Sequence, residues 1–302
     1  MKKIFVPPIK CQGIKTKLVS WIKDYLVDYN GIWIEPFMGS GVVGFNVMPK
    51  KAIFCDSNPY IIMFYNDLKN NKINSAIIKD FLLIENEKLL EGKDEYYKEV
   101  RSRFNKSPNS LDFLFLNRAC FNGVIRFNRK GLFNTPFCKK PNRFATSYIT
   151  KICNQVSNIQ QILEQNDYTF INQDFYKSIK MATSSDFIYC DPPYIDRYAD
   201  YYNGWNEIDE IKLFELLNNT DAKFLMSSWY GNEYRENKYI KSLWKNFNIS
   251  IRNHYYYIGA KERNRNPMTE AIIYNYNLDK VFDDNISIPK SEFQLSFLEK
   301  IS

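Results

Sequence analysis

Histidine, paired cysteines and long apolar runs are scarce or absent in this sequence. His254 is the single histidine among 302 residues, which argues against a histidine-dependent triad or general base. The six cysteines include no C-x-x-C pair, so we expect no metal site and reduced thiols in a cytoplasmic protein. No stretch approaches the roughly 18 uninterrupted apolar residues of a membrane-spanning helix, and Pro7, Pro8 and Lys10 interrupt any secretion signal.

Basic charge is concentrated in one part of the chain. The formal net charge is +7, yet the segment from Arg101 to Arg143 has ten basic residues against one acidic residue, Asp112, which gives it +9 and leaves −2 for the rest. Phenylalanines interleave with these cations, as is typical of a nucleic-acid surface on an aromatic scaffold, although they would also serve as a plain hydrophobic core. The residues that we expect to contact DNA come from the stretch NRACFNGVIRFNR: Arg118, Asn122, Arg126 and Asn128.

Strand and helix patterns alternate at both ends of the chain, whereas residues from about 70 to 165 have helical and loop patterns. Strands are predicted at residues 31–37, 51–56, 168–175, 186–190 and 223–228, and two alternating runs at 248–258 and 269–276 are expected to pair as antiparallel neighbours. This order predicts an α/β fold with a mostly parallel sheet and a C-terminal antiparallel strand. The predicted domain is split, with residues 1–58 and 165–302 flanking an inserted helical subdomain at 59–164.

A glycine-rich turn follows the first predicted strand. The stretch EPFMGSGVVG has Gly39, Gly41 and Gly44 in the G-x-G-x-x-G spacing, between a strand and a helix. Asp56 ends the next strand, where an acid can bind ribose hydroxyls. The loop by itself fits a dinucleotide-dependent oxidoreductase or an S-adenosylmethionine enzyme.

The stretch YCDPPY favours the second cofactor. Two prolines stop the strand that ends at Cys190, so Asp191 begins a stiff loop at its carboxyl end, where ligands bind in α/β sheets. The Asp191 carboxylate and the Pro192 carbonyl can accept the two N–H groups of an exocyclic amine and stabilise the charge that develops as it is methylated. Pro193 would keep the loop rigid, and Tyr194 would stack on a base that has been flipped out of the duplex.

Several motifs in this order resemble the Dam-type, α-group DNA adenine-N6 methyltransferases. They are PPIKCQGIK, EPFMGSGVVG, FCDSNPYIIMFYNDLK, LNRACFNGVIRFNRKGLFNTPF, NQDFYKSI, DFIYCDPPY and RNRNPMTEAIIYNY. The resemblance spans nearly the whole chain, from about residue 8 to 276. It implies a Rossmann-like methyltransferase fold, S-adenosyl-L-methionine as cofactor, double-stranded DNA as substrate and a target-recognition role for residues 59–164.

The resemblance also implies a set of site residues. By similarity, the cofactor would be bound by Cys11, Lys15, Phe37, Gly39, Asp56, Asp174, Phe175 and Asp191. The catalytic residues would be Asp191, Pro192, Pro193 and Tyr194, without a metal. Two positions depart from the family pattern: Cys11 replaces the usual tryptophan, and Ile14 replaces a glycine.

These departures leave one other function open, and the glycine-rich turn leaves a second. A DNA-binding protein with an inactive methyltransferase core is one alternative, and an NAD-dependent oxidoreductase is another. Similar enzymes often recognise GATC, while related ones recognise other adenine-containing sites. Some act with a cognate restriction endonuclease and some act alone, inside bacterial or phage-infected cells.

Overall fold

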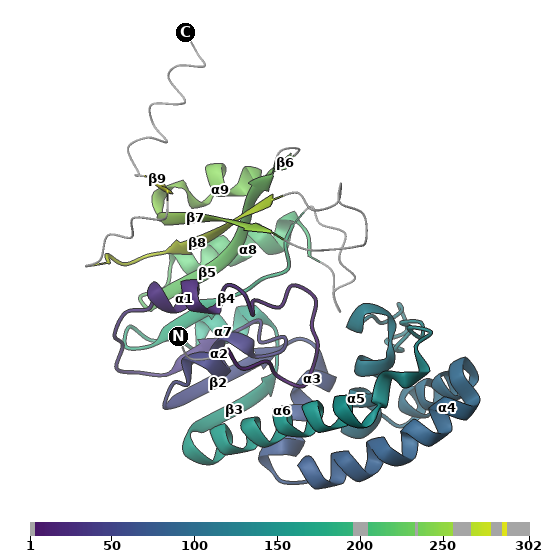
Figure 1. Cartoon of the computed structure of the whole chain (residues 1–302). Helices are drawn as coiled ribbons and strands as arrows, with labels where there is room; N and C mark the ends of the chain where they lie inside the picture. The colour runs from purple at the N-terminus through teal and green to yellow at the C-terminus, as the bar shows by residue number, and fades with distance from the viewer. Residues whose placement is uncertain (1–3, 196–204, 233–234, 256–266, 279–285, 289–302) are drawn as a thin grey trace. The chain divides into compact units, whose positions relative to one another are not determined.

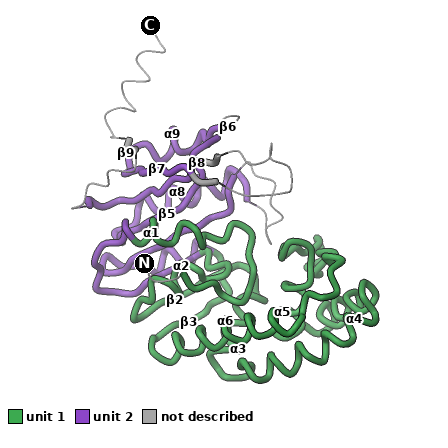
Figure 2. The backbone as a smooth tube through the Cα atoms, viewed as in Figure 1, with its two compact units in different colours: residues 1–23, 37–174, 199–204 green, residues 24–36, 175–198, 205–302 purple. Residues whose placement is uncertain are grey.

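The computed structural model describes residues 4–195, 205–232, 235–255, 267–278 and 286–288. The chain forms two compact units, coloured separately in Figure 2. Unit 1 comprises residues 1–23, 37–174 and 199–204, and unit 2 comprises residues 24–36, 175–198 and 205–302.

Unit 1 contains two parallel strands and a set of helices (Figure 1). Its elements are α1 (Val19–Asp24, whose last residue belongs to unit 2), α2 (Val42–Val47), β2 (Lys51–Asp56), α3 (Pro59–Lys69), α4 (Ser75–Lys106), α5 (Ser110–Ala119), the 3-10 turns Phe121–Gly123 and Pro141–Phe144, α6 (Thr146–Gln165) and β3 (Asp167–Asn172). Asn58 begins α3 by accepting a hydrogen bond from the Tyr60 N–H at 3.0 Å, and Pro59 occupies the first helical position.

Aromatic side chains join these helices to the two strands. The Phe45 ring of α2 lies 5.3 Å from Phe54 on β2, centroid to centroid, and 5.3 Å from Tyr65 on α3. Tyr65 in turn stacks on Phe170 of β3 at 5.4 Å. Such pairs add to the apolar burial that holds α2 and α3 on the strands.

Helix α4 is folded back on itself. Arg103 Nη2 lies 3.0 Å from Glu85 Oε2, although 18 residues of straight helix would separate the two positions by about 27 Å. The reversal occurs at Lys93, whose φ of 46° and ψ of −119° are not helical. Arg103 Nε also donates to Asp112 Oδ2 of α5 at 2.8 Å, so one guanidinium links both arms of the α4 hairpin (residues 75–106) to α5 (Figure 1).

Unit 2 contains a mixed sheet with the strand order β1-β4-β5-β8-β7-β9. Strand β6 lies outside this order and pairs with β5. The elements of unit 2 are β1 (Trp33–Glu35), α7 (Phe175–Lys180), β4 (Phe187–Cys190), α8 (Glu207–Asn218), β5 (Lys223–Asn232), β6 (Arg235–Glu236), α9 (Lys238–Ser242), the 3-10 turn Trp244–Asn246, β7 (Asn248–Tyr255), β8 (Pro267–Tyr274) and β9 (Ile286–Ile288). Strands β1, β4 and β5 are parallel, and β8, β7 and β9 add to them in antiparallel pairs.

The predicted α/β class, with parallel strands followed by antiparallel C-terminal strands, is confirmed. The expected antiparallel pairing of the last two runs is also correct, with Asn248 opposite Tyr274. The strand predicted at 168–175 is too long. It ends at Asn172 because its partner on β2, Asp56, is the last residue of that strand, and α7 begins at Phe175.

The helices from α3 to α6 lie within residues 59–165, which overlap the inserted subdomain predicted at 59–164. The compact units divide the chain differently, because unit 1 joins residues 37–58 to these helices. The assignment of 59–164 to target recognition stays a prediction. Among the described residues, no helix is both long enough and apolar enough to cross a membrane.

Candidate active site

The glycine-rich turn of unit 1 is held by the end of strand β2. The Met38 N–H donates to the Cys55 carbonyl and the Gly39 N–H to Asp56 Oδ2, each at 2.8 Å. The second carboxylate oxygen, Asp56 Oδ1, accepts the Asn58 N–H at 2.8 Å. One carboxylate therefore fixes both the turn before α2 and the turn before α3.

Two of the glycines are required by the backbone. Gly39 and Gly41 have φ values of 50° and 72°, in the left-handed region that favours glycine. A Cβ at Gly41 would run into the Phe45 ring. A Cβ at Gly39 would instead meet only Cys11, at 3.8 Å from its Cβ, so the absence of a side chain there leaves the backbone of the turn open.

Cys11 lies beside this turn. Burial, and then the nearby Asp56 carboxylate, raise the pKa of the Cys11 thiol, which stays protonated. Burial also raises the pKa of Asp56, against the lowering effect of the Asn58 and Gly39 N–H groups. The structure thus brings together three of the predicted cofactor-binding residues, Cys11, Gly39 and Asp56.

The remaining cofactor candidates are more dispersed. Lys15 is buried, with 3% of its surface exposed; its Nζ donates to the Gly13 carbonyl at 3.0 Å, and its own carbonyl accepts the Leu18 and Val19 N–H groups at the start of α1. Phe37 is half-buried and Asp174 is exposed. Phe175 is buried at the first position of α7 in unit 2, where its ring lies 5.3 Å from Trp205.

The second predicted cluster lies in unit 2, directly after strand β4. Pro192 and Tyr194 are buried, whereas Asp191 and Pro193 are half-buried. Asp191 Oδ1 itself is shielded from solvent. The Tyr194 hydroxyl donates to Glu270 Oε2 of strand β8 at 2.5 Å.

Carboxylates surround the thiol at the end of β4. Burial raises the pKa of Cys190 well above its usual value, and the negative charges of Asp191 and Glu35 raise it further. Glu35 ends strand β1, is 2% exposed and accepts a hydrogen bond from Trp33 Nε1 at 3.0 Å. Two carboxyl groups, Asp191 and Glu35, therefore lie at the carboxyl ends of the neighbouring strands β4 and β1, an arrangement suited to a group that develops positive charge.

Two residues of this region were missed by the sequence analysis. Glu35 could have been found, because it is an acid at the carboxyl end of a predicted strand, immediately before Pro36. Glu270 offered only a weak signal, a single acid in the otherwise apolar run EAIIY. Nothing in the sequence indicates that it meets Tyr194.

Comparisons with known proteins identify the family of this chain. Residues 12–258 match the family model of the D12 class N6 adenine-specific DNA methyltransferases. This chain belongs to that family. The resemblance inferred from the motifs is confirmed, and the oxidoreductase alternative is excluded.

Some of the similar proteins are named type II methyltransferases, and others are named DNA adenine methylases. The chain is 29% identical to the type II methyltransferase M1.LlaDCHI of Lactococcus lactis subsp. cremoris, over 89% of this chain and 95% of that protein. It is 32% identical to a DNA adenine methylase of Vibrio cholerae, over 70% of this chain and 76% of that protein. Its 27% identity to the type II methyltransferase M.FokI of Planomicrobium okeanokoites covers 89% of this chain but 42% of that longer protein.

Arg118, one of the four predicted DNA contacts of this D12-class chain, is 8% exposed. Its Nη1 donates to the Pro8 carbonyl, and its own carbonyl accepts Arg143 Nε, both at 3.0 Å. Burial, followed by the charges of Arg118 and Arg143, lowers the pKa of Lys10 to about 8. These three cations thus gather where the N-terminal segment crosses α5.

The other three predicted contacts lie in the segment after α5. Asn122 is exposed with a φ of 53°, and Arg126 is half-buried with its Nε donating to Asn134 Oδ1 at 2.9 Å. Asn128 Oδ1 accepts the N–H groups of Lys130 and Leu132, at 2.9 and 3.1 Å. Arg126 and Asn128 therefore help to shape this segment, and DNA contact by all four residues stays a prediction.

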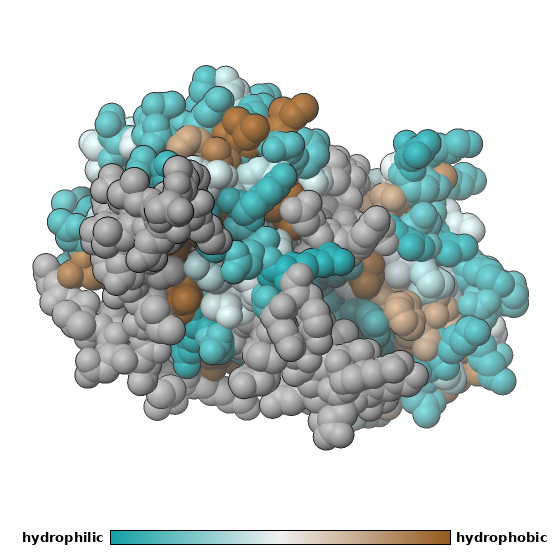
Figure 3. Space-filling model, turned by 90° about the horizontal axis from the view of Figure 1, so that it is seen from above, coloured by the Kyte–Doolittle hydropathy of each residue, from teal (hydrophilic) through white to brown (hydrophobic). Residues whose placement is uncertain are grey.

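The surface of the helical segment is mostly hydrophilic on one face. Figure 3 shows this at the right of the view, where α4 and the segment after α5 lie in Figure 1. Arg129 and Lys130, in the segment after α5, are exposed. Several phenylalanines of the segment 101–143 form a core, since Phe104, Phe113 and Phe115 are fully buried, whereas Phe121 is 54% exposed.

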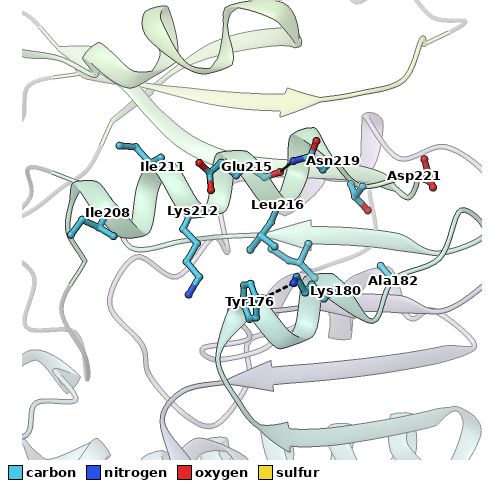
Figure 4. Close-up of a pocket in the computed structure, with 12 residues that line it drawn as sticks. Tyr176, Lys180, Ala182, Ile208, Ile211, Lys212, Glu215, Leu216, Asn219 and Asp221 are labelled. Carbon is cyan, nitrogen blue, oxygen red and sulfur yellow. Dashed lines mark hydrogen bonds between the residues drawn. The ribbon is translucent and has the colours of Figure 1, made fainter.

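Unit 2 also has a groove of about 740 Å³ between α7 and α8 (Figure 4). Lys180 Nζ donates to the Tyr176 hydroxyl at 2.5 Å, and Lys212 Nζ lies 4.5 Å from the centroid of the same ring. None of the predicted site residues lines this groove. Within the described ranges, no group of three or more His, Cys, Asp or Glu side chains is arranged to hold a metal ion.

Proposed function

We propose that this protein transfers a methyl group from S-adenosyl-L-methionine to N6 of an adenine at a specific sequence in duplex DNA. The observation that carries the proposal is the placement of Asp191–Tyr194 at the carboxyl end of parallel strand β4, in a chain that belongs to the adenine-N6 family. Its double-stranded DNA substrate and its cofactor are inferred from that family and from the chemistry of the two clusters.

The residues of unit 1 fit the cofactor. A carboxylate has about four lone-pair sites, and Asp56 uses two of them for the Gly39 and Asn58 N–H groups, so it retains acceptor capacity for ribose hydroxyls. The open backbone at Gly39 allows close approach of the methionine part. When bound, S-adenosyl-L-methionine supplies a methyl group activated by its sulfonium charge. Cys11 would contact it through a smaller side chain than the family's tryptophan.

Unit 2 supplies the acceptors for the adenine amine. The amine nitrogen is a weak nucleophile because its lone pair is delocalised into the ring. Asp191 and the Pro192 carbonyl would accept its two N–H bonds, which favours tetrahedral nitrogen and stabilises the positive charge that develops on it. The carboxylate charges of Asp191 and Glu35 around the end of β4 add to this stabilisation. The amine proton leaves through Asp191 or through water.

The target adenine must leave the duplex to reach these groups, because its N6 takes part in base pairing. Tyr194 would stack on the flipped base, and the basic segment 101–143 would bind the phosphates. The relatives are named both type II methyltransferases and DNA adenine methylases. A restriction endonuclease acting at the same site is therefore one candidate partner, and a solitary enzyme is the other.

The deciding experiment is methylation of unmethylated plasmid DNA by the purified protein with S-adenosyl-L-methionine, followed by single-molecule modification sequencing. We expect N6-methyladenine at one short sequence. Asp191→Ala should lower the rate at least ~100-fold while leaving DNA binding and folding intact. Equilibrium dialysis with labelled S-adenosyl-L-methionine checks the inactive-core alternative. A folded protein that binds DNA but neither binds the cofactor at millimolar concentration nor methylates would overturn the proposal.

A further inference from the structure

Tyr194 is tied to a strand far away in the sequence. Its hydroxyl donates to Glu270 Oε2 at 2.5 Å, across 76 residues. Both side chains are buried, with 8% of Tyr194 and 1% of Glu270 exposed. Glu270 lies in β8 between two neighbours, opposite Trp229 of β5 and Arg252 of β7. The contact therefore joins the loop after β4 to the interior of the antiparallel part of the sheet.

A carboxylate is energetically unfavourable at such a buried position. Moving an ionised carboxylate out of water is unfavourable unless hydrogen bonds compensate, and an apolar residue would fill a central strand without that penalty. What the carboxylate provides is a strong acceptor: a hydrogen bond from a hydroxyl to an ionised oxygen is shorter and about twice as strong as a neutral one. Glu270 offers this acceptor to the hydroxyl of Tyr194.

The bond fixes the loop at its second end. Asp191 leaves β4 directly after Cys190, which is in register with Met226 of β5. Pro192 and Pro193 each restrict φ, so little freedom remains between the strand and Tyr194. Once the Tyr194 hydroxyl is held by β8, the loop Asp191–Tyr194 is anchored on two different strands.

Preorganised acceptors are effective because they need no reorganisation when charge develops. We propose that Glu270 is a positioning residue for methyl transfer, which holds the Tyr194 ring and, through it, the Asp191 and Pro192 acceptors in the arrangement that receives the adenine. This inference rests on the proposed function of that loop. It assigns a role in the reaction to a residue that would not itself touch the substrate.

The test is a double-mutant cycle in single-turnover methylation. Tyr194→Phe removes the hydroxyl and keeps the ring, and Glu270→Ala removes the acceptor. Each should lower the methyl-transfer rate about tenfold, and the double variant should be no slower than the single ones, because both remove the same bond. Glu270→Gln keeps an uncharged acceptor and should restore part of the rate. The dissociation constants for S-adenosyl-L-methionine and DNA should change less than the rate.

Tyr276→Phe is the matched control. The Tyr276 hydroxyl, also buried in unit 2, donates to the Tyr25 carbonyl at 2.8 Å, so its loss removes a similar bond away from the loop. It should leave the methylation rate unchanged. A second readout is the fluorescence of 2-aminopurine at the target position, which reports base flipping and should be altered by Tyr194→Phe and Glu270→Ala but not by Tyr276→Phe.

Three results would overturn the proposal. The first is a folded Glu270→Ala or Tyr194→Phe variant with the wild-type rate, and the second is additivity of the two changes. The third is an equal loss in Tyr276→Phe, which would mark the effect as general destabilisation. If Glu270→Ala does not fold, Tyr194→Phe and Glu270→Gln decide the matter. A wild-type protein without methyl transfer would refute the proposed function and this inference together, whereas an active wild type with unaffected variants refutes only the role of Glu270.

Discussion

Asp56→Asn should weaken cofactor binding more than it weakens the fold. In the structure the two carboxylate oxygens each accept a backbone N–H, from Gly39 and from Asn58, at 2.8 Å. An asparagine amide has one acceptor oxygen and an NH₂ group, so one of the two N–H groups would face a donor in place of an acceptor. The turn around Gly39 or the start of α3 must then shift.

The size of the effect follows from these two bonds. A hydrogen bond to a charged acceptor contributes about 1.5–3 kcal/mol, and one of the two is lost. If the turn must be restored when the cofactor binds, that energy is subtracted from binding, which corresponds to a loss of about 10- to 100-fold in affinity for S-adenosyl-L-methionine. The loss of a ribose acceptor adds to this.

The stability of the fold should respond differently. Because burial raises the pKa of Asp56, the folded state favours the protonated carboxyl group over the ionised one. The contribution of this group to the free energy of unfolding is therefore fully present below the unfolded pKa of about 3.9, and it is lost as the pH rises through the folded pKa. A neutral asparagine escapes that loss. The destabilisation caused by Asp56→Asn, relative to the wild type, should therefore be smaller at neutral pH than in acid.

Isothermal titration with S-adenosyl-L-methionine measures the affinity, and urea denaturation across pH measures the free energy of unfolding. Asp167→Asn is the control, since Asp167 is an exposed aspartate at the start of β3. An affinity of Asp56→Asn within twofold of the wild type, equal to that of the control, would refute the reasoning about the turn.

Three other changes test other parts of the structure. Lys93→Gly should raise the free energy of unfolding by about 1 kcal/mol in thermal or urea denaturation, because the φ of 46° and ψ of −119° at this position favour glycine. Asp186→Asn should destabilise the protein at neutral pH but little in acid. Burial raises the pKa of Asp186, but the N–H groups of Ile32 and Thr183 and the Thr183 hydroxyl lower it overall, so the stabilisation by this carboxylate is lost as the pH falls below about 4. A difference in unfolding free energy that does not depend on pH would contradict this. Arg129→Ala should flatten the dependence of log affinity for DNA on log salt by about one unit, measured by fluorescence anisotropy, and an unchanged slope would show that Arg129 does not contact phosphate.

Local sequence patterns predicted most of the strands. The strand at 51–56 was predicted with both of its ends, because Asp56 is followed by Ser57, Asn58 and Pro59, which begin a helix. The run at 168–175 was overextended since its end depends on the length of a strand that precedes it by more than 100 residues. Where a strand ends because its partner strand ends, the local sequence pattern does not predict that end.

The sequence indicated candidate site residues where a motif is contiguous. Asp191–Tyr194 and the glycine turn could be identified from short stretches, because prolines and glycines constrain the backbone locally. The burial of Arg118 could not be predicted, because its partner, the Pro8 carbonyl, lies 110 residues away in the sequence. Similarly, Arg103 counted toward the basic charge of its segment, yet Asp112 and Glu85 neutralise it in the structure. Long-range pairing decides which charges remain for DNA.

The folded-back form of α4 has a consequence for how this family member can vary. Glu85 and Arg103 brace the two arms well below the tip, where Glu91, Gly92 and Lys93 are exposed. Beyond this brace, the Tyr96 ring still contacts Phe115 of α5, and the Tyr97 ring stacks on Phe137, so the second arm is fixed almost up to the tip. The tip at Glu91, Gly92 and Lys93 is thus the place in the α4 hairpin where a reporter peptide can be inserted while the packing of both arms is kept.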